Sequence, residues 1–131
     1  MIFQHTHEWV TAVSPHTGDP KTSTARVVKE GELSIRAWGA LSPVIRVFNG
    51  NDRAVYKLGY TYAVQPGRGK KAVGRIQITD IRRGDVRDQP ASFYRAEGFA
   101  SKQQFLDLWH KMHGGNCDAW LISFVLRETF M

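Results

Sequence analysis

The stretch Glu97-Gly-Phe-Ala-Ser-Lys-Gln-Gln-Phe-Leu-Asp-Leu-Trp-His-Lys-Met-His113 carries the clearest structural signal in the chain. Its apolar residues follow the i, i+3, i+4, i+7 spacing of an amphipathic helix: Phe105, Leu108, Trp109 and Met112. Ser101 and Gln104 fit a capping box at the start, and Gly114 with the next glycine supplies a stop. The pattern predicts a helix over residues 101–113, with Glu97-Gly98-Phe99 just ahead of it.

Extended segments flank this helix on both sides. Residues 118–127 are apolar on both faces of a two-residue repeat, as expected of a strand inside a sheet or barrel. Upstream, residues 72–78 alternate between apolar and polar, and the alternation breaks at Asp80-Ile81, which indicates a bulge or the end of the strand.

The first half of the chain predicts further strands and one short helix. Residues 22–28 are rich in β-branched side chains, and residues 44–48 lead into a hairpin signal at Asn49-Gly-Asn-Asp52. The returning strand, residues 54–64, is interrupted near Gly59. A helix over residues 6–13 has to end before Pro15. We therefore expect an α+β fold of about five or six strands and two or so helices.

Composition indicates one basic domain. The chain has 131 residues, 42% of them hydrophobic, which suits a single domain over residues 1–131. The net charge of +6 favours anionic partners such as nucleotides or RNA. Cys117 is the only cysteine, which suits a buried thiol in a reducing, cytoplasmic compartment. We expect no signal peptide and no membrane span, because no apolar run approaches ~20 residues. Three tryptophans are assigned to the core: Trp38, Trp109 and Trp120.

The segment Lys21-Thr-Ser-Thr-Ala-Arg26 concentrates an amine, three hydroxyls and a guanidinium in six residues. A lysine held in an apolar pocket has a lowered pKa and can take the proton of a nearby hydroxyl nucleophile. In a regular strand, Lys21 and Thr24 would point to opposite faces, so they can share a pocket only if Lys21 lies in the preceding loop or a bulge intervenes. The alternative is an ordinary edge strand with a solvated lysine.

Two further features could contact a ligand. Glu97 could accept hydrogen bonds from a base or transfer protons, or it could simply favour the positive end of the helix that follows. The glycine-rich loop over residues 66–71 carries Arg68 and Lys70, which could hold a phosphate, or it could be a solvated hairpin loop.

No metal site is expected. His5 and His7 are two residues apart, and His110 and His113 share a face of the predicted helix. For neither pair does the spacing fix a third ligand, and a zinc site usually needs three or four protein ligands. The candidate chemistry is therefore independent of metals and cofactors.

Three stretches in this order resemble the ASCH family, which has a PUA-like fold: residues 21–26, residues 73–78, and Glu97-Gly98-Phe99 with the helix after it. The similarity spans roughly residues 3–127. The chain departs from the family pattern at Asp19-Pro20, which adds a residue between Gly18 and Lys21, and at Ala25, where a larger side chain is common. Residues 28–51 match the family poorly and are expected to form an elaborated loop or hairpin.

The resemblance implies a PUA-like β-barrel with a cleft lined by these motifs. Small bacterial members are associated with amidohydrolysis of N4-acetylated cytidine by a lysine, a threonine and a glutamate, which map to Lys21, Thr24 and Glu97. The expected substrate is thus a small acylated nucleoside, and the reaction is cleavage of its amide bond. Expected substrate contacts are Ser23, Arg26, Arg68, Lys70 and Phe99. The alternatives are an RNA-binding module or ribonuclease of the ASCH type, and a small-ligand-binding barrel without chemistry.

Overall fold

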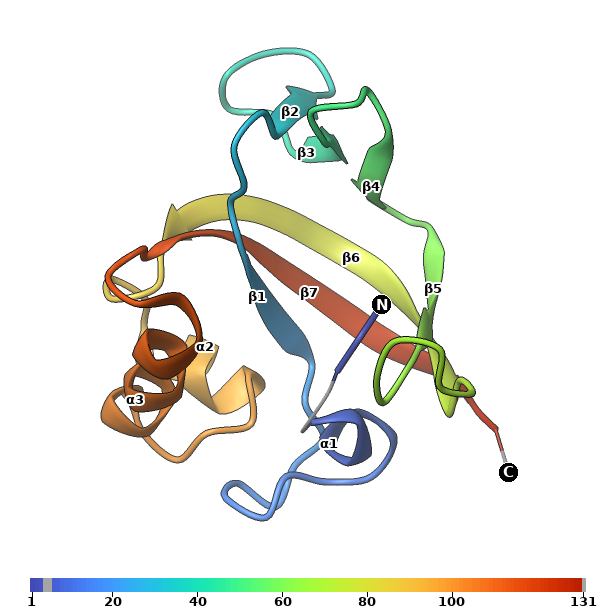
Figure 1. Cartoon of the computed structure of the whole chain (residues 1–131), viewed down its shortest axis with the longest axis vertical. Coiled ribbons are helices and arrows are strands. Elements are labelled where there is room, and N and C mark those ends of the chain that lie inside the picture. Colours follow the sequence, from blue (N-terminus) through green and yellow to red (C-terminus); the bar gives the residue numbers. More distant parts are fainter. Residues whose placement is uncertain (4–5, 131) are drawn as a thin grey trace.

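A computed structural model describes residues 1–3 and 6–130, which contain three helices and seven strands. Figure 1 shows their arrangement. In chain order the elements are α1 (His7–Thr11), β1 (Ser23–Val27), β2 (Leu33–Arg36), β3 (Val44–Phe48), β4 (Ala54–Lys57), β5 (Thr61–Val64), β6 (Gly74–Asp85), α2 (Ala91–Ala96), α3 (Lys102–His113) and β7 (Asp118–Thr129).

The main sheet is antiparallel, with strand order β1-β7-β6-β5. The long strands β6 and β7 pair along their whole length (Figure 1). A register shift between Ile78 and Asp80 shows that the predicted break is a bulge, after which β6 continues to Asp85. The N-terminal segment extends the curl beyond β5, because Ile2 bridges to Gln65 in parallel. The result is a curled half-barrel, and the fold is α+β of the PUA-like type.

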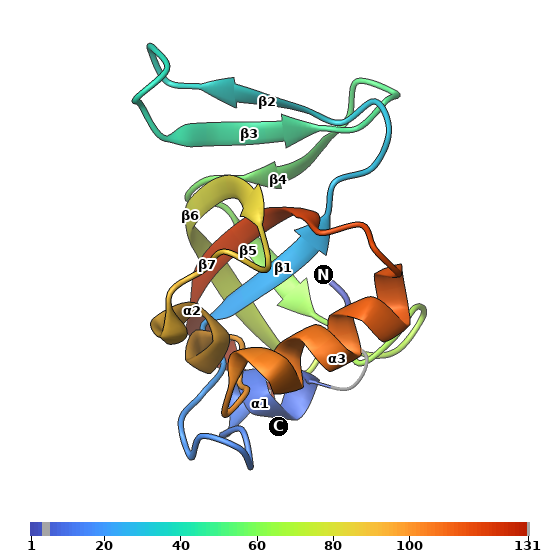
Figure 2. The same cartoon turned by 90° about the vertical axis from the view of Figure 1, so that its left-hand side faces the viewer.

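A second, three-stranded antiparallel sheet has the order β2-β3-β4 and covers one end of the barrel (Figure 2). The predicted hairpin joins β3 and β4. The predicted interruption of the returning strand is also confirmed, because Gly59, at φ +82°, separates β4 of the second sheet from β5 of the first. Residues 28–51, expected to form a loop or hairpin, contain the antiparallel pair β2 and β3.

The core lies on both sides of the main sheet. On one side α2 and α3 pack against it through Phe93, Phe105 and Trp109, together with the buried thiol of Cys117. On the other side the second sheet packs against it around Trp120. Ser101 caps α3 as predicted, accepting a hydrogen bond from the backbone N–H of Gln104.

The prediction that Trp38 belongs to the core is wrong. Its side chain is 80% exposed in the loop after β2, where no second layer of structure covers it. Helix α2 and strand β2 were also not predicted. Helix α2 has six residues and no side-chain N-cap, and all four residues of β2 are exposed, so neither carries a long periodic signal. No helix in the described part of the chain is long and apolar enough to cross a membrane.

Candidate active site

A cavity of about 290 Å³ lies between β1, helix α3 and the N-terminal segment. Its volume lies just below the ~300–1,000 Å³ range of small-molecule sites. The polar groups on its wall are Thr6, Lys21, Thr24, Arg26, Lys29, Tyr56, Glu97 and His113. The apolar wall consists of Ile2, Phe3, Ala25, Val27, Phe99, Phe105, Leu108, Trp109 and Met112. A wall that combines polar groups with apolar and aromatic side chains suits a flat, partly polar ligand.

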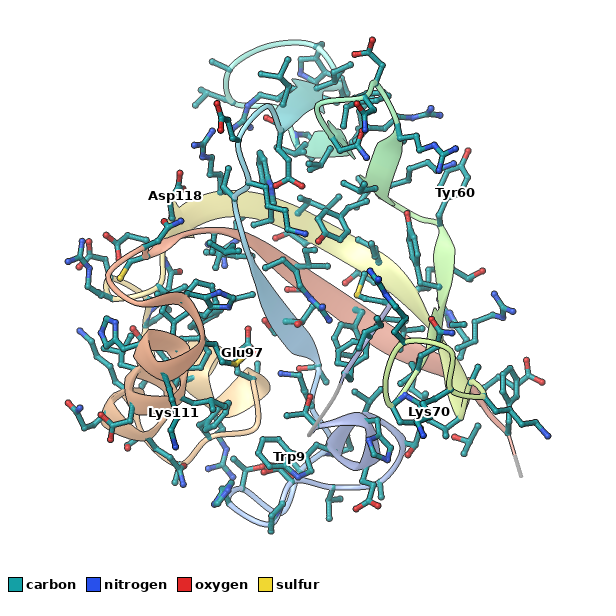
Figure 3. The ribbon with its side chains drawn as sticks, viewed as in Figure 1. Trp9, Tyr60, Lys70, Glu97, Lys111 and Asp118 are labelled. Atoms are coloured by element: carbon teal, nitrogen blue, oxygen red, sulfur yellow. The ribbon has the colours of Figure 1, made fainter. Side chains whose placement is uncertain are left out.

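A buried pair of opposite charges forms one end of this cavity. Lys21 Nζ donates a hydrogen bond to Glu97 Oε2 at 2.7 Å and another to the Glu97 carbonyl at 2.9 Å. The side chains are only 5% and 3% exposed. Ser23 Oγ donates to the other carboxylate oxygen, Oε1, at 3.4 Å. Figure 3 shows Glu97 between the helices and β1.

The backbone before β1 explains how Lys21 and Thr24 share one cavity. Lys21 precedes the strand, and its N–H donates to the carbonyl of Trp9 at 2.7 Å. The Thr22 N–H donates to the carbonyl of Ala96, at the end of α2, at 2.9 Å. These bonds hold Lys21 outside the regular strand, so the alternation of side chains no longer sends it to the face opposite Thr24. The sequence left two options, Lys21 in the loop before the strand or a bulge within the strand. The structure confirms the loop position of Lys21.

The turn after α2 places the carboxylate of Glu97. Glu97 is the C-cap of α2, and Gly98 follows at φ +99°, in the region that favours glycine. A Cβ on Gly98 would lie 2.6 Å from Cε3 of the Trp9 ring, so the ring also excludes any side chain there. The fully buried Ser14 hydroxyl donates to the Gly98 carbonyl and anchors the turn.

Burial shifts both members of the charge pair toward their neutral forms. Desolvation lowers the pKa of Lys21, and the attraction of Glu97 only partly opposes it. Desolvation likewise raises the pKa of Glu97, against the stabilising effect of Lys21. A neutral amine beside a protonated carboxyl is therefore much more accessible here than it is in water.

Thr24 and Arg26 add a hydroxyl and a cation to the cavity wall. Thr24 is buried and lines the cavity, but no hydrogen bond within the described residues joins its hydroxyl to Lys21. Arg26 Nη2 donates to the Ile2 carbonyl at 2.8 Å, and its guanidinium lies 5.0 Å from the Phe3 ring centroid. Burial lowers the pKa of Arg26. The amine can reach the Thr24 hydroxyl only through a bound molecule or a side-chain movement.

Of the other residues predicted to contact the substrate, some line the cavity and some do not. Phe99 lines the cavity, packed edge-on against Trp9. Ser23 does not line the cavity, and only its hydrogen bond to Glu97 connects it to the site. Arg68 and Lys70 are exposed on the loop before β6 and do not line the cavity, and Figure 3 shows Lys70 well away from Glu97.

The histidine pairs do not assemble into a metal site in the described residues. His5 lies outside those residues, so the pair that it forms with His7 cannot be placed. Across residues 1–3 and 6–130, no group of three or more His, Cys, Asp or Glu side chains could hold a metal ion. His113 instead packs against Trp109, with ring centroids 4.4 Å apart, at the edge of the cavity.

Sequence reasoning missed Tyr56, Phe3 and Ile2 as part of the cavity wall. Tyr56 comes from β4 of the second sheet, and burial raises the pKa of its hydroxyl. Only the alternation in β4 could have indicated that Tyr56 and Ala54 share one face of the strand and that Val55 lies on the other. Nothing local indicates that this face meets β1.

No protein-family model matches the chain, and no curated protein matches it either. Among solved structures, the chain is similar to the crystal structure of protein EF3133 from Enterococcus faecalis V583, of the family DUF984, with a TM-score of 0.53 and 15% sequence identity. The match covers 85% of this chain and 66% of the other, so the chain spans just under two thirds of that protein. At this level of identity the likeness shows the fold alone, and it agrees with the α+β half-barrel described above.

Proposed function

We propose that the protein is an ASCH-type amidohydrolase that removes an acyl group from the exocyclic N4 of acylated cytosine nucleosides. The observation that carries the proposal is the buried Lys21–Glu97 pair, 2.7 Å apart, in a cavity that Thr24 also lines. A shifted acid–base pair beside a hydroxyl and an open, ligand-sized space is the arrangement expected of nucleophilic catalysis.

Thr24 is the nucleophile. Its Oγ1 attacks the acyl carbonyl carbon while its proton passes to the neutral amine of Lys21. The new C–O bond gives a tetrahedral oxyanion, and the C–N bond then breaks as Lys21 returns the proton to the leaving N4 amine. Water next attacks the acyl-threonine ester with Lys21 again as base, which releases the carboxylic acid and restores Thr24.

Glu97 orients the nucleobase of the substrate and keeps the amine of Lys21 available as a proton acceptor. The lowered pKa of Lys21 and the raised pKa of Glu97 make a neutral amine beside a protonated carboxyl more accessible than it is in water, which favours Lys21 as the base. The absent Lys21–Thr24 hydrogen bond is consistent with this role, because catalytic contacts in unliganded sites are often long and tighten when substrate binds.

The aromatic part of the cavity wall suits the nucleobase. Phe99, Phe105 and Trp109 present aromatic surfaces to the cavity. Stacking on such surfaces would hold a base while its polar edge meets Arg26 and Glu97. Arg26 is also placed to neutralise negative charge that develops on the carbonyl oxygen, because it lines the same space.

The direct test is hydrolysis of N4-acetylcytidine by purified protein, followed as loss of the acylated base's absorbance, with a parallel reaction in EDTA. We expect EDTA-resistant conversion to cytidine. Thr24→Ala should lower kcat by at least ~100-fold, whereas Thr22→Ala, an exposed threonine two residues away, should keep normal turnover. Near-normal turnover by folded Thr24→Ala would contradict the nucleophile assignment.

A second candidate is RNA binding, favoured by the net charge of +6 and by the exposed cations Arg68 and Lys70 outside the cavity. It predicts affinity for oligonucleotides that falls steeply with salt, because binding releases counterions. Salt-sensitive binding without turnover of N4-acetylcytidine would favour this candidate over the amidohydrolase.

A further inference from the structure

Strand β2 is an open edge that carries exposed apolar side chains. It is the outer strand of the three-stranded sheet, beyond β3, and all of its residues are exposed (Figure 2). Leu33 is 70% exposed and Ile35 48%. The loop that follows β2 adds Trp38 and Leu41, 80% and 102% exposed. An unpaired edge with such side chains is a template for pairing with another strand.

The two faces of β2 differ in character. The register with β3 pairs Ser34 with the fully buried Val47, so Ser34 lies on the face toward the barrel. Leu33 and Ile35 lie on the outer face, because side chains alternate along a strand. Glu32, just before the strand, shares the inner face and accepts a hydrogen bond from Trp120 Nε1 at 3.0 Å.

The sequence Glu32-Leu33-Ser34-Ile35-Arg36 is self-complementary when two copies run antiparallel with Ser34 opposite Ser34. In that register Leu33 of each copy meets Ile35 of the other on the outer face. On the inner face Glu32 of each copy meets Arg36 of the other. The Leu33–Ile35 pair and the Glu32–Arg36 pair are therefore each formed twice, as a two-fold symmetric interface requires.

We propose that β2 is a homodimerisation edge, at which two copies of this chain join their three-stranded sheets into one continuous six-stranded sheet. The side chains that would pair are not fully engaged within the chain. Arg36 uses Nη1 to donate to the Ser42 carbonyl and Glu32 accepts through Oε1, which leaves the other guanidinium nitrogens and Oε2 for the second copy. Trp38 follows the strand alongside residues 30–31 of the second copy and extends the contact.

The pairing is short, so the dimer belongs to the weak, concentration-dependent class. Sedimentation or light scattering between about 1 and 500 μM should show a monomer–dimer equilibrium. Ile35→Lys removes two apolar pairs, and Arg36→Glu sets like charges opposite each other, so each should weaken dimerisation by about tenfold or more. Val13→Lys alters an equally exposed apolar residue (50%) near α1, away from β2, and should leave the equilibrium unchanged.

A cysteine at the symmetry centre gives a second, independent test. Residues directly opposite in an antiparallel pair have Cα atoms about 4.5–5.5 Å apart, within the range that a disulfide spans. The natural Cys117 is buried, so Ser34→Cys should form a disulfide-linked dimer under mild oxidation, whereas Val13→Cys should not. A wild-type monomer at all these concentrations, or cross-linking of Ser34→Cys no faster than of Val13→Cys, overturns the proposal and leaves β2 open to a different partner.

Discussion

Removing both members of the Lys21–Glu97 pair should harm the fold less than the sum of the two single removals. The pair is 2.7 Å apart and almost fully buried. Lys21→Met leaves a buried carboxylate without its partner, and Glu97→Met leaves a buried amine without its partner. Each single loss of a buried partner costs about 3–5 kcal/mol. With an unfolding entropy of about 2.1 cal/mol/K per residue over 131 residues, each single variant should melt about 11–18 °C lower.

The double variant Lys21→Met/Glu97→Met leaves no unpaired charge. It still removes the donor to the Glu97 carbonyl and the acceptor of the Ser23 hydroxyl, at about 1–3 kcal/mol for each buried group left unsatisfied. We therefore expect a loss of about 2–6 kcal/mol, below the about 6–10 kcal/mol expected if the single effects added.

Urea denaturation of the four proteins measures these free energies of unfolding directly. The exposed pair Arg95–Asp19, with N and O 3.0 Å apart, is the matched control, and its disruption should change stability by less than about 1 kcal/mol. A double variant whose loss equals the sum of the single losses, within about 0.5 kcal/mol, would refute the view that the two buried charges depend on each other.

Three further predictions concern protonation and backbone. Because burial lowers the pKa of Lys21 and the neutral amine is the base, kcat/KM on the acylated nucleoside should rise with pH with a midpoint below 10.5, and a midpoint at or above that value would contradict the assignment. Gly98→Ala should lower the free energy of unfolding in urea by at least ~3 kcal/mol, because the new Cβ would combine a positive φ with a clash against the Trp9 ring. Gly59→Ala is the control: its φ is similar but no atom lies close to the new Cβ, so it should cost only ~1–2 kcal/mol. The hydrogen bonds from Arg87 hold the pKa of Asp85 at about 2, so Arg87→Ala should return it toward 3.8 in an NMR titration, and an unchanged value would mean that the pair does not form in solution.

The features that could be predicted from the sequence are those with local causes. The capped helix α3, the interruption at Gly59 and the bulge near Asp80 each follow from the residues that form them. Helix α2 and strand β2 could not be predicted, because one is short and uncapped and the other buries neither face. Trp38 was misplaced for a related reason, since a large aromatic residue is usually buried and only the tertiary structure reveals an uncovered loop.

In the candidate site, too, the sequence indicates single residues, whereas only the tertiary structure shows which of them lie together. Lys21 and Glu97 are 76 residues apart, and their chemistry singled out each of them, but only the fold shows that they touch. Arg68 and Lys70 were grouped with them because basic residues on a glycine-rich loop suit phosphates. The loop does not line the cavity, whereas Tyr56 does, although its sequence surroundings carry no such signal.

Energetics also argue for a chemical role of the charged end of the cavity. Apolar side chains of similar volume commonly stabilise a core as well as a buried ion pair does, or better. Here the lysine, the carboxylate and Thr24 line one space large enough for a ligand, and the glycine turn that holds Glu97 tolerates no side chain. Departures from the rules for a stable core are most common where a protein performs chemistry. This cluster is therefore the place where substitutions should separate activity from stability, because Thr24→Ala removes the proposed nucleophile and leaves the buried charge pair intact.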